Sequence, residues 1–255
     1  MARATAADDR RKAAEALAGH PASAEGRAAL RVLASDADPG VRAAALWSLG
    51  RAGDAADVAR LVAAIADRDP SVSADAVAAL ARVAARTKGQ GAVAPRLCAL
   101  LPDPRAYVVV NALAGLRLLG ATCPEGGESL LSISRPAVVR RAAAVHLRHR
   151  VAAGGDPAQK AAAALARCAT DERDAEVADA CAGPALTPVR GEVARELSIF
   201  VVADGGSEPR GRSPFAVARP DGFVHLGIAD RRGALLERDL GRGEVRLEVP
   251  APLVR

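Results

Sequence analysis

The chain has 255 residues, of which 50% are hydrophobic but only 2% aromatic, and its formal net charge is +5. This composition excludes a disordered chain, because it supplies enough apolar side chains for a core, which must be built mainly from Ala, Val and Leu. No segment is long and apolar enough to cross a bilayer, and the first residues lack the hydrophobic stretch of a secretory signal. We therefore expect a cytoplasmic protein that neither spans nor binds a membrane.

A sequence motif of 14 residues recurs along the part of the chain that is expected to be helical. The segment Asp36 to Leu49 (Asp-Ala-Asp-Pro-Gly-Val-Arg-Ala-Ala-Ala-Leu-Trp-Ser-Leu) comes back at Asp67 to Leu80 as Asp-Arg-Asp-Pro-Ser-Val-Ser-Ala-Asp-Ala-Val-Ala-Ala-Leu. The closing leucine recurs at Leu116 and Leu147. A self-similar unit of roughly 30 to 40 residues is typical of stacked helical hairpins.

Each copy is interpreted as a first helix, a turn and a second helix. Asp38-Pro39 and Asp69-Pro70 predict helix starts, because the aspartate accepts hydrogen bonds from the first-turn amides and proline is tolerated at the first helical position. An opening pair without Asp-Pro and a degraded last copy are expected at the ends of such a stack. The expected second helices are 54–66, 92–101, 128–133 and 157–168, the opening pair is 8–17 and 22–33, and the last copy is 174–181.

The Asp-x-Asp-Pro-x-Val-Arg-x-x-Ala-x-x-x-Leu pattern resembles the short HEAT-like repeat, which also occurs in phycobilin lyases and in many bacterial adaptor proteins. The resemblance covers roughly residues 8–182 and implies a right-handed α-solenoid of about five hairpins. The arginine of the pattern is present as Arg42 and Arg140 but is replaced by Ser73 and Val109. A continuous ladder of Asp and Arg contacts between copies is therefore not expected.

The pattern changes after Cys181, where helical spacing gives way to alternation and turn dipeptides. Segments 229–233 and 239–247 are similar to carboxypeptidase-regulatory-like, transthyretin-like β-sandwich modules, which implies an accessory binding or packing module. The predicted fold class is α + β in separate domains, with a small antiparallel sandwich or partly open barrel at the C-terminal end. The domains are 1–182 (solenoid), 183–194 (linker) and 195–255 (β-rich), and the strands are 196–203, 215–218, 222–228, 233–237 and 244–249.

Residues able to carry chemistry are few and scattered. Two histidines, His146 and His149, have a spacing that could chelate a metal ion, but no nearby carboxylate or thiol completes the set and neighbouring arginines oppose a cation. The chain has no nucleophile elbow, phosphate loop or dinucleotide fingerprint, so we expect neither enzymatic activity nor a cofactor. None of the cysteines forms a Cys-x-x-Cys pair, and reduced, buried thiols are expected at Cys98, Cys123, Cys168 and Cys181.

Two kinds of residue are candidates for binding a partner. Trp47 and Tyr107, each alone of its type, would anchor a partner if exposed, or would fill gaps in the helical core if buried. Residues 129–155 contain no acidic residue, and their arginines suit either an acidic protein patch or a solvated face. The candidate arginines are Arg140, Arg141, Arg148 and Arg150.

These observations predict a non-enzymatic scaffold or adaptor whose solenoid surface holds another protein or a peptide, as adaptor or client of an associated enzyme. A nucleic-acid-binding solenoid is one rival hypothesis, but its basic residues are sparse on the second helices and lack interleaved aromatic residues. A phycobilin-lyase-like subunit is a second rival hypothesis, and a structural subunit of a larger assembly is a third. The partner, the pathway and the oligomeric state stay open.

Overall fold

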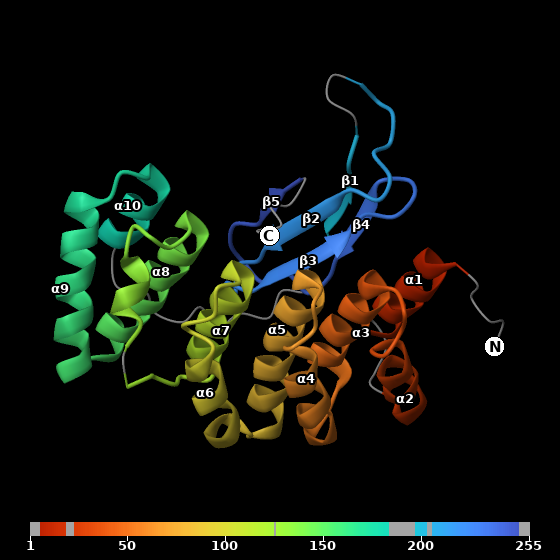
Figure 1. Cartoon of the computed structure of the whole chain (residues 1–255), viewed down its shortest axis with the longest axis horizontal. Helices are drawn as coiled ribbons and strands as arrows, with labels where there is room; N and C mark the ends of the chain where they lie inside the picture. The colour runs from red at the N-terminus through yellow and green to blue at the C-terminus, as the bar shows by residue number, and fades with distance from the viewer. Residues whose placement is uncertain (1–5, 19–22, 125, 184–196, 203–205, 250–255) are drawn as a thin grey trace.

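The computed structural model describes residues 6–18, 23–124, 126–183, 197–202 and 206–249 (Figure 1). Within these residues the chain first forms ten α-helices and then five strands. This order confirms the predicted fold class. The expected linker lies outside the described residues from position 184 onward.

The helices form hairpins at the predicted places, with one exception. The second helix expected at 128–133 is a single 3-10 turn, η2 (Glu128–Leu131). It follows Gly126 and Gly127, both at positive φ, and precedes a serine-containing segment that is a poor helix former. The remaining elements are α1 (Ala7–Ala18), α2 (Ala24–Leu33), α3 (Pro39–Ala52), η1 (Ala55–Asp57), α4 (Val58–Ala64), α5 (Pro70–Thr87), α6 (Gln90–Ala99), α7 (Ala106–Leu118), α8 (Ala137–Ala153), α9 (Asp156–Asp171) and α10 (Ala175–Ala182).

The recurring aspartates cap helices as predicted. The side chain of Asp38 accepts a hydrogen bond from the amide of Val41 at 3.1 Å, and that of Asp69 accepts one from the amide of Ser71 at 2.9 Å. Proline occupies the first turn in both helices. Capping of this kind typically contributes about 1 kcal/mol to helix stability.

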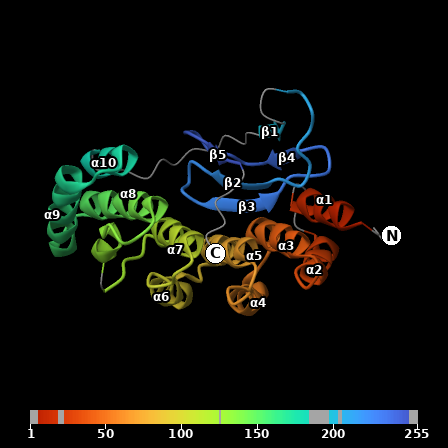
Figure 2. The same cartoon turned by 45° about the horizontal axis from the view of Figure 1, so that its top comes forward.

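The first helices of the hairpins pack side by side in one row, and α2, α4 and α6 lie on the far side of that row from the strands (Figure 2). Small residues allow this close stacking. A Cβ atom at Gly50 of α3 would lie 2.9 Å from Cα of Ala79 in α5, and one at Gly115 of α7 would lie 2.7 Å from Cβ of Ala81. The alanine-rich composition is therefore what lets neighbouring helices approach.

The strands form two small antiparallel sheets that do not close into a barrel. The first sheet has the order β1-β4 and the second has the order β3-β2-β5. In the second sheet Val217 lies opposite His225, and Ala218 opposite Val224. The bounds are β1 (Leu197–Phe200), β2 (Pro214–Ala218), β3 (Val224–Ile228), β4 (Ala234–Glu237) and β5 (Arg246–Glu248).

The sheet that contains β3 packs on α3, α5 and α7, on the inner side of the helical row (Figures 1 and 2). Phe223, Val224 and Leu226 belong to the same hydrophobic cluster as the buried leucines of these three helices. Helices α8 to α10 have a separate cluster around Leu147 and Leu165. The main core thus spans the helices and the sheet, and α8 adds Val139 and Ala143 to it. The last three helices, which we call the arm, also share a second, smaller core.

The cysteine prediction is wrong, because all four cysteines are paired in disulfides. Cys98 bonds to Cys123, and Cys168 bonds to Cys181. Hairpin stacking places Cys98 of α6 beside the loop after α7, and Cys168 of α9 beside α10, so tertiary packing sets the pairs. None of the helices in the described part is both long and apolar enough to span a membrane.

Candidate functional site

The inner face of the solenoid holds β3 through its backbone. The side chain of Asn111 in α7 donates to the carbonyl oxygen of Val224 at 3.0 Å and accepts from the amide of Val224 at 2.8 Å. The same side chain donates to the carbonyl oxygen of Ala74 in α5 at 2.9 Å. Asn111 is fully buried, so these bonds satisfy polar groups that water cannot reach.

A second contact of the same kind comes from the neighbouring repeat. Asp75 of α5 accepts a hydrogen bond from the amide of Leu226 at 3.3 Å. Asp75 and Asn111 occupy equivalent positions in their copies, where the first and fourth copies have Ala44 and Ala142. Two successive helices therefore recognise alternate residues of one extended strand, whose side chains at this spacing point to the same face.

His225 joins three elements at the centre of this interface. Its ring is stacked on Trp47 of α3, with ring centroids 4.3 Å apart. Its Nδ1 makes a short contact with Oε1 of Glu237 in β4, and its Nε2 lies 3.6 Å from Oδ2 of Asp75. Because both ring nitrogens face carboxyl groups and the ring is 6% exposed, the imidazole serves as a buried bridge between helix and strand.

The electrostatics of this cluster depend on burial. Burial raises the pKa of Asp75 to about 8, against the opposing effect of His225. Burial also disfavours the charged forms of His225 and Glu237, but their mutual attraction outweighs it. The pKa of His225 is raised and that of Glu237 is lowered. These directions favour a neutral Asp75 beside a charged His225–Glu237 pair.

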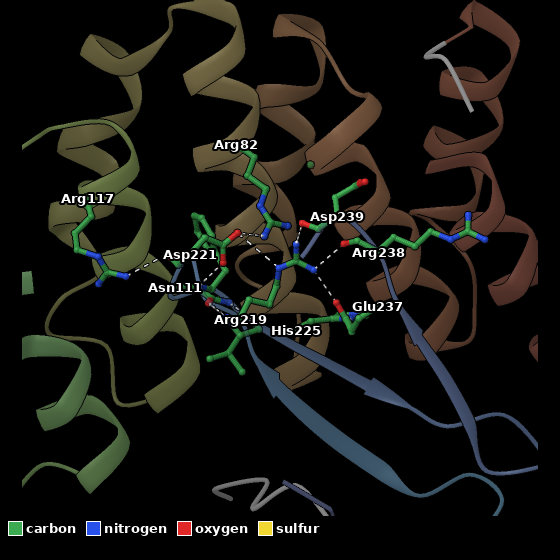
Figure 3. Close-up of polar contacts among 12 residues, drawn as sticks. Arg82, Asn111, Arg117, Arg219, Asp221, His225, Glu237, Arg238 and Asp239 are labelled. Carbon is green, nitrogen blue, oxygen red and sulfur yellow. Dashed lines mark hydrogen bonds and ion pairs between the residues drawn. The ribbon is translucent and has the colours of Figure 1, made fainter. Parts of the chain in front are cut away.

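Arginines close one side of the cluster (Figure 3). The guanidinium of Arg82 lies 4.1 Å from the ring centre of Trp47 and also pairs with Asp221 at 3.1 Å. Arg219 donates to Oε2 of Glu237 at 2.8 Å and to the carbonyl of Asp239 at 2.7 Å. Cation–π stacking and charge-assisted hydrogen bonds thus attach the β2–β3 turn to α5 and link the same turn to the end of β4.

The two aromatic candidates lie at this internal interface. Trp47 is 8% exposed and is covered by His225 and Arg82. Tyr107 is 6% exposed, and its hydroxyl donates to Oε2 of Glu248 at 3.3 Å. Burial and the nearby carboxylate raise the pKa of Tyr107, which stays neutral. The strands of the same chain therefore contact both side chains.

The four candidate arginines are distributed over α8, where each contacts another part of the molecule. Arg140 makes two hydrogen bonds to the carboxylate of Glu172, at 2.7 and 3.0 Å, and Arg141 pairs with Glu176 at 2.6 Å. Arg148 donates to the carbonyl of Ala180 at 3.4 Å. Arg150 lines a cleft.

That cleft, which we call the arm cleft, has a volume of about 800 Å³ and lies between the loop after α7 and helix α9. Arg150 forms part of its wall, donating to the carbonyl of Gly126 at 2.6 Å and lying 3.2 Å from Glu128. Exposed Lys160 and Arg167 of α9 form the other wall. Its volume falls within the range typical of ligand-binding clefts.

Sequence reasoning missed Asp75, Asn111, His225 and Glu237. The available signal was the alignment of the copies, which places a polar side chain at position 75 and again at position 111 on a face that is otherwise apolar. His146, weighed as a metal ligand, is 2% exposed, and burial lowers its pKa to about 3. Within the described residues no cluster of three or more His, Cys, Asp or Glu side chains is arranged to hold a metal ion.

A family model for HEAT repeats matches residues 1–81, which contain α1 to α4 and most of α5. No curated protein and no solved structure matches the chain. The match agrees with the repeat pattern in the opening hairpins, and the hairpins after residue 81 continue the same stacking.

Proposed function

We propose that this protein is a non-enzymatic scaffold or adaptor that binds another protein. The main support for the proposal is that two helix side chains, Asn111 and Asp75, form hydrogen bonds with the backbone of an extended strand. HEAT repeats generally mediate protein–protein contacts, and the N-terminal repeats match that family. The helical face is therefore suited to holding polypeptide.

The middle of that face already holds β3, so the partner docks elsewhere. Releasing β3 would expose Phe223 and Leu226, each 1% exposed, at a cost of about 1.5–3 kcal/mol per side chain. We assign docking to the arm cleft, which is open and lies between the loop after α7 and helix α9, where it contains the exposed side chains of Lys160 and Arg167. An acidic segment of the partner would complement these two cations.

The test compares proteins captured from cell extract by the full chain and by the double variant Lys160→Glu, Arg167→Glu. Both positions are exposed on α9, so the variant should fold normally. We expect a partner retained by the wild type under mild salt to be lost or weakened at least tenfold by the variant, as judged by quantitative mass spectrometry.

The control is Arg96→Glu on α6, which makes the same kind of charge reversal at a single exposed position outside the cleft. It should retain the partner. Equal retention by all three proteins, or retention of no protein at all, would contradict the proposal.

We also propose that the protein works in an oxidising compartment rather than in the cytoplasm expected from its sequence. Two disulfides support this, because such bonds persist mainly outside the reducing cytosol. Alkylation of the protein in intact cells should then find no reactive thiol at Cys98, Cys123, Cys168 or Cys181. Rapid labelling of all four in a properly folded protein would reject this location.

A further inference from the structure

A second cleft, which we call the α1 cleft, is lined by residues of the first helix and of the strands. Helix α1 lies at the opposite end of the helical row from the arm (Figure 2). Its volume is about 280 Å³. This is just below the range of pockets that hold drug-sized molecules, so the cleft suits one compact group. Ion pairs hold its walls together, with Lys12 bonded to Asp230 at 2.8 Å and Arg231 to Asp8 at 2.9 Å.

The walls of the α1 cleft are mostly apolar. Phe215 and Leu235 form its buried side and are 5% and 7% exposed. Phe200 of β1 lines the opening and is 66% exposed, an unusual degree for a large apolar side chain. A ligand that covered Phe200 would remove apolar surface from water, which favours binding.

One buried cation faces this apolar space. Arg11 of α1 lines the cleft and is 7% exposed. Its Nε lies 3.6 Å from Oε1 of Glu15, too far for a hydrogen bond, and has no hydrogen-bond partner among the described residues. A buried guanidinium nitrogen without a hydrogen bond is costly unless a ligand provides one.

Glu15, the neighbour of Arg11, does not exclude an anion. Burial raises the pKa of its carboxyl group, although Arg11 opposes this. Because burial favours the protonated form of this group, it opposes a bound anion less than an ordinary carboxylate does. Arg238 adds positive charge to the lining, whereas Lys12 and Asp230 form an ion pair with each other.

From this combination we infer that the α1 cleft binds a carboxylate that carries one compact apolar group, with the carboxylate on Arg11 and the apolar group against Phe200 and Phe215. The carboxylate belongs either to a free organic acid or to the C-terminal residue of a peptide, since both present the same chemistry. This inference does not depend on the proposed protein-binding function, because it concerns a different cleft.

The experiment titrates the full chain by calorimetry with two probes, 3-phenylpropionate and the tripeptide Ala-Ala-Phe, each as the acid and as the amide. Binding of an acid without binding of its amide supports the inference, and the acid that binds identifies the source. Equal binding of acid and amide, or no binding of either acid, overturns it.

Three variants connect any binding to the cleft. Arg11→Gln removes the cation and should weaken acid binding at least tenfold, the loss expected for a hydrogen bond to a charged group. Ala16→Trp at an exposed position fills the cleft and should abolish binding without changing the thermal midpoint. Arg96→Gln, outside the cleft, should leave binding unchanged. Unaltered affinity in both Arg11→Gln and Ala16→Trp would place the binding elsewhere and refute the inference.

Discussion

The middle of the solenoid and its C-terminal arm are built from the same kind of hairpin but are stabilised in different ways. In the middle, α3, α5 and α7 bury their inner face under β3 and share one hydrophobic cluster with it. In the arm, α8 to α10 have a smaller cluster, a disulfide and a buried ion pair between Arg140 and Glu172. In the middle repeats, the β-rich segment therefore covers the helical face that an open solenoid would offer to a partner.

The largest effect is expected from Phe223→Ala, which removes a fully buried ring from the shared core. The free energy of unfolding should fall by about 3–5 kcal/mol. Because Trp47 lies at the interface, its fluorescence and the part of the circular dichroism that comes from the middle helices should report one coincident denaturation in the wild type and in the variant, with the arm helices unfolding separately.

The control for this prediction is Phe200→Ala, which truncates the same side chain where it is 66% exposed and should change stability by less than about 0.5 kcal/mol. Two separate transitions, with only the fluorescence transition moved by Phe223→Ala, would show that the β-rich segment is an independent domain.

Sequence alone predicted what depends on local physics. The Asp38-Pro39 and Asp69-Pro70 signals located helix starts because capping involves residues close together in the chain. The docking of β3 could not be predicted in this way, since the contact between Asn111 and Val224 joins residues 113 positions apart. The burial of Trp47 follows from that docking.

A smaller loss is expected from Asn111→Ala, which leaves the carbonyl and amide of Val224 without their buried partner. We expect the free energy of unfolding to fall by about 2–3 kcal/mol, and amide exchange at Val224 to accelerate. The matched control is Ala142→Asn, which places the same side chain at the equivalent position of α8. If the amide of Val224 exchanges as slowly in Asn111→Ala as in the wild type, the hydrogen bonds of Asn111 are not what holds β3 on the helices.

A loss of about 2 kcal/mol, confined to the arm, is expected when Cys168 and Cys181 are both replaced by serine, because this disulfide closes a short loop. Hydrogen exchange should speed up in α9 and α10 while the Trp47 fluorescence transition stays in place. Replacing Cys98 and Cys123 instead should speed up hydrogen exchange in α6 and in the loop after α7, and should leave exchange in the arm helices unchanged. An equal effect of both pairs on Trp47 would argue that the arm and the middle unfold as one unit.

The smallest effect, counted per pH unit, is a pH dependence located in the middle of the molecule. The unfolded chain loses the Asp75 proton near pH 4, whereas the folded chain keeps it until about pH 8. Between these values the folded state binds more protons, so this carboxyl group makes stability fall as pH rises. Asp75→Asn removes the titration and keeps an acceptor for Leu226. The variant should match the wild type near pH 4 and gain about 1.4 kcal/mol on it for each pH unit above that, up to about pH 8, because the two states differ by one bound proton in this range.

The control for this pH dependence is Asp69→Asn at the helix cap, which should show no such gain at pH 8 in the same denaturation series. A stability difference between Asp75→Asn and wild type that stays constant from pH 4 to 8 would mean that Asp75 ionises normally in the folded protein. In that case the strand would be held by a charged carboxylate rather than by a neutral one.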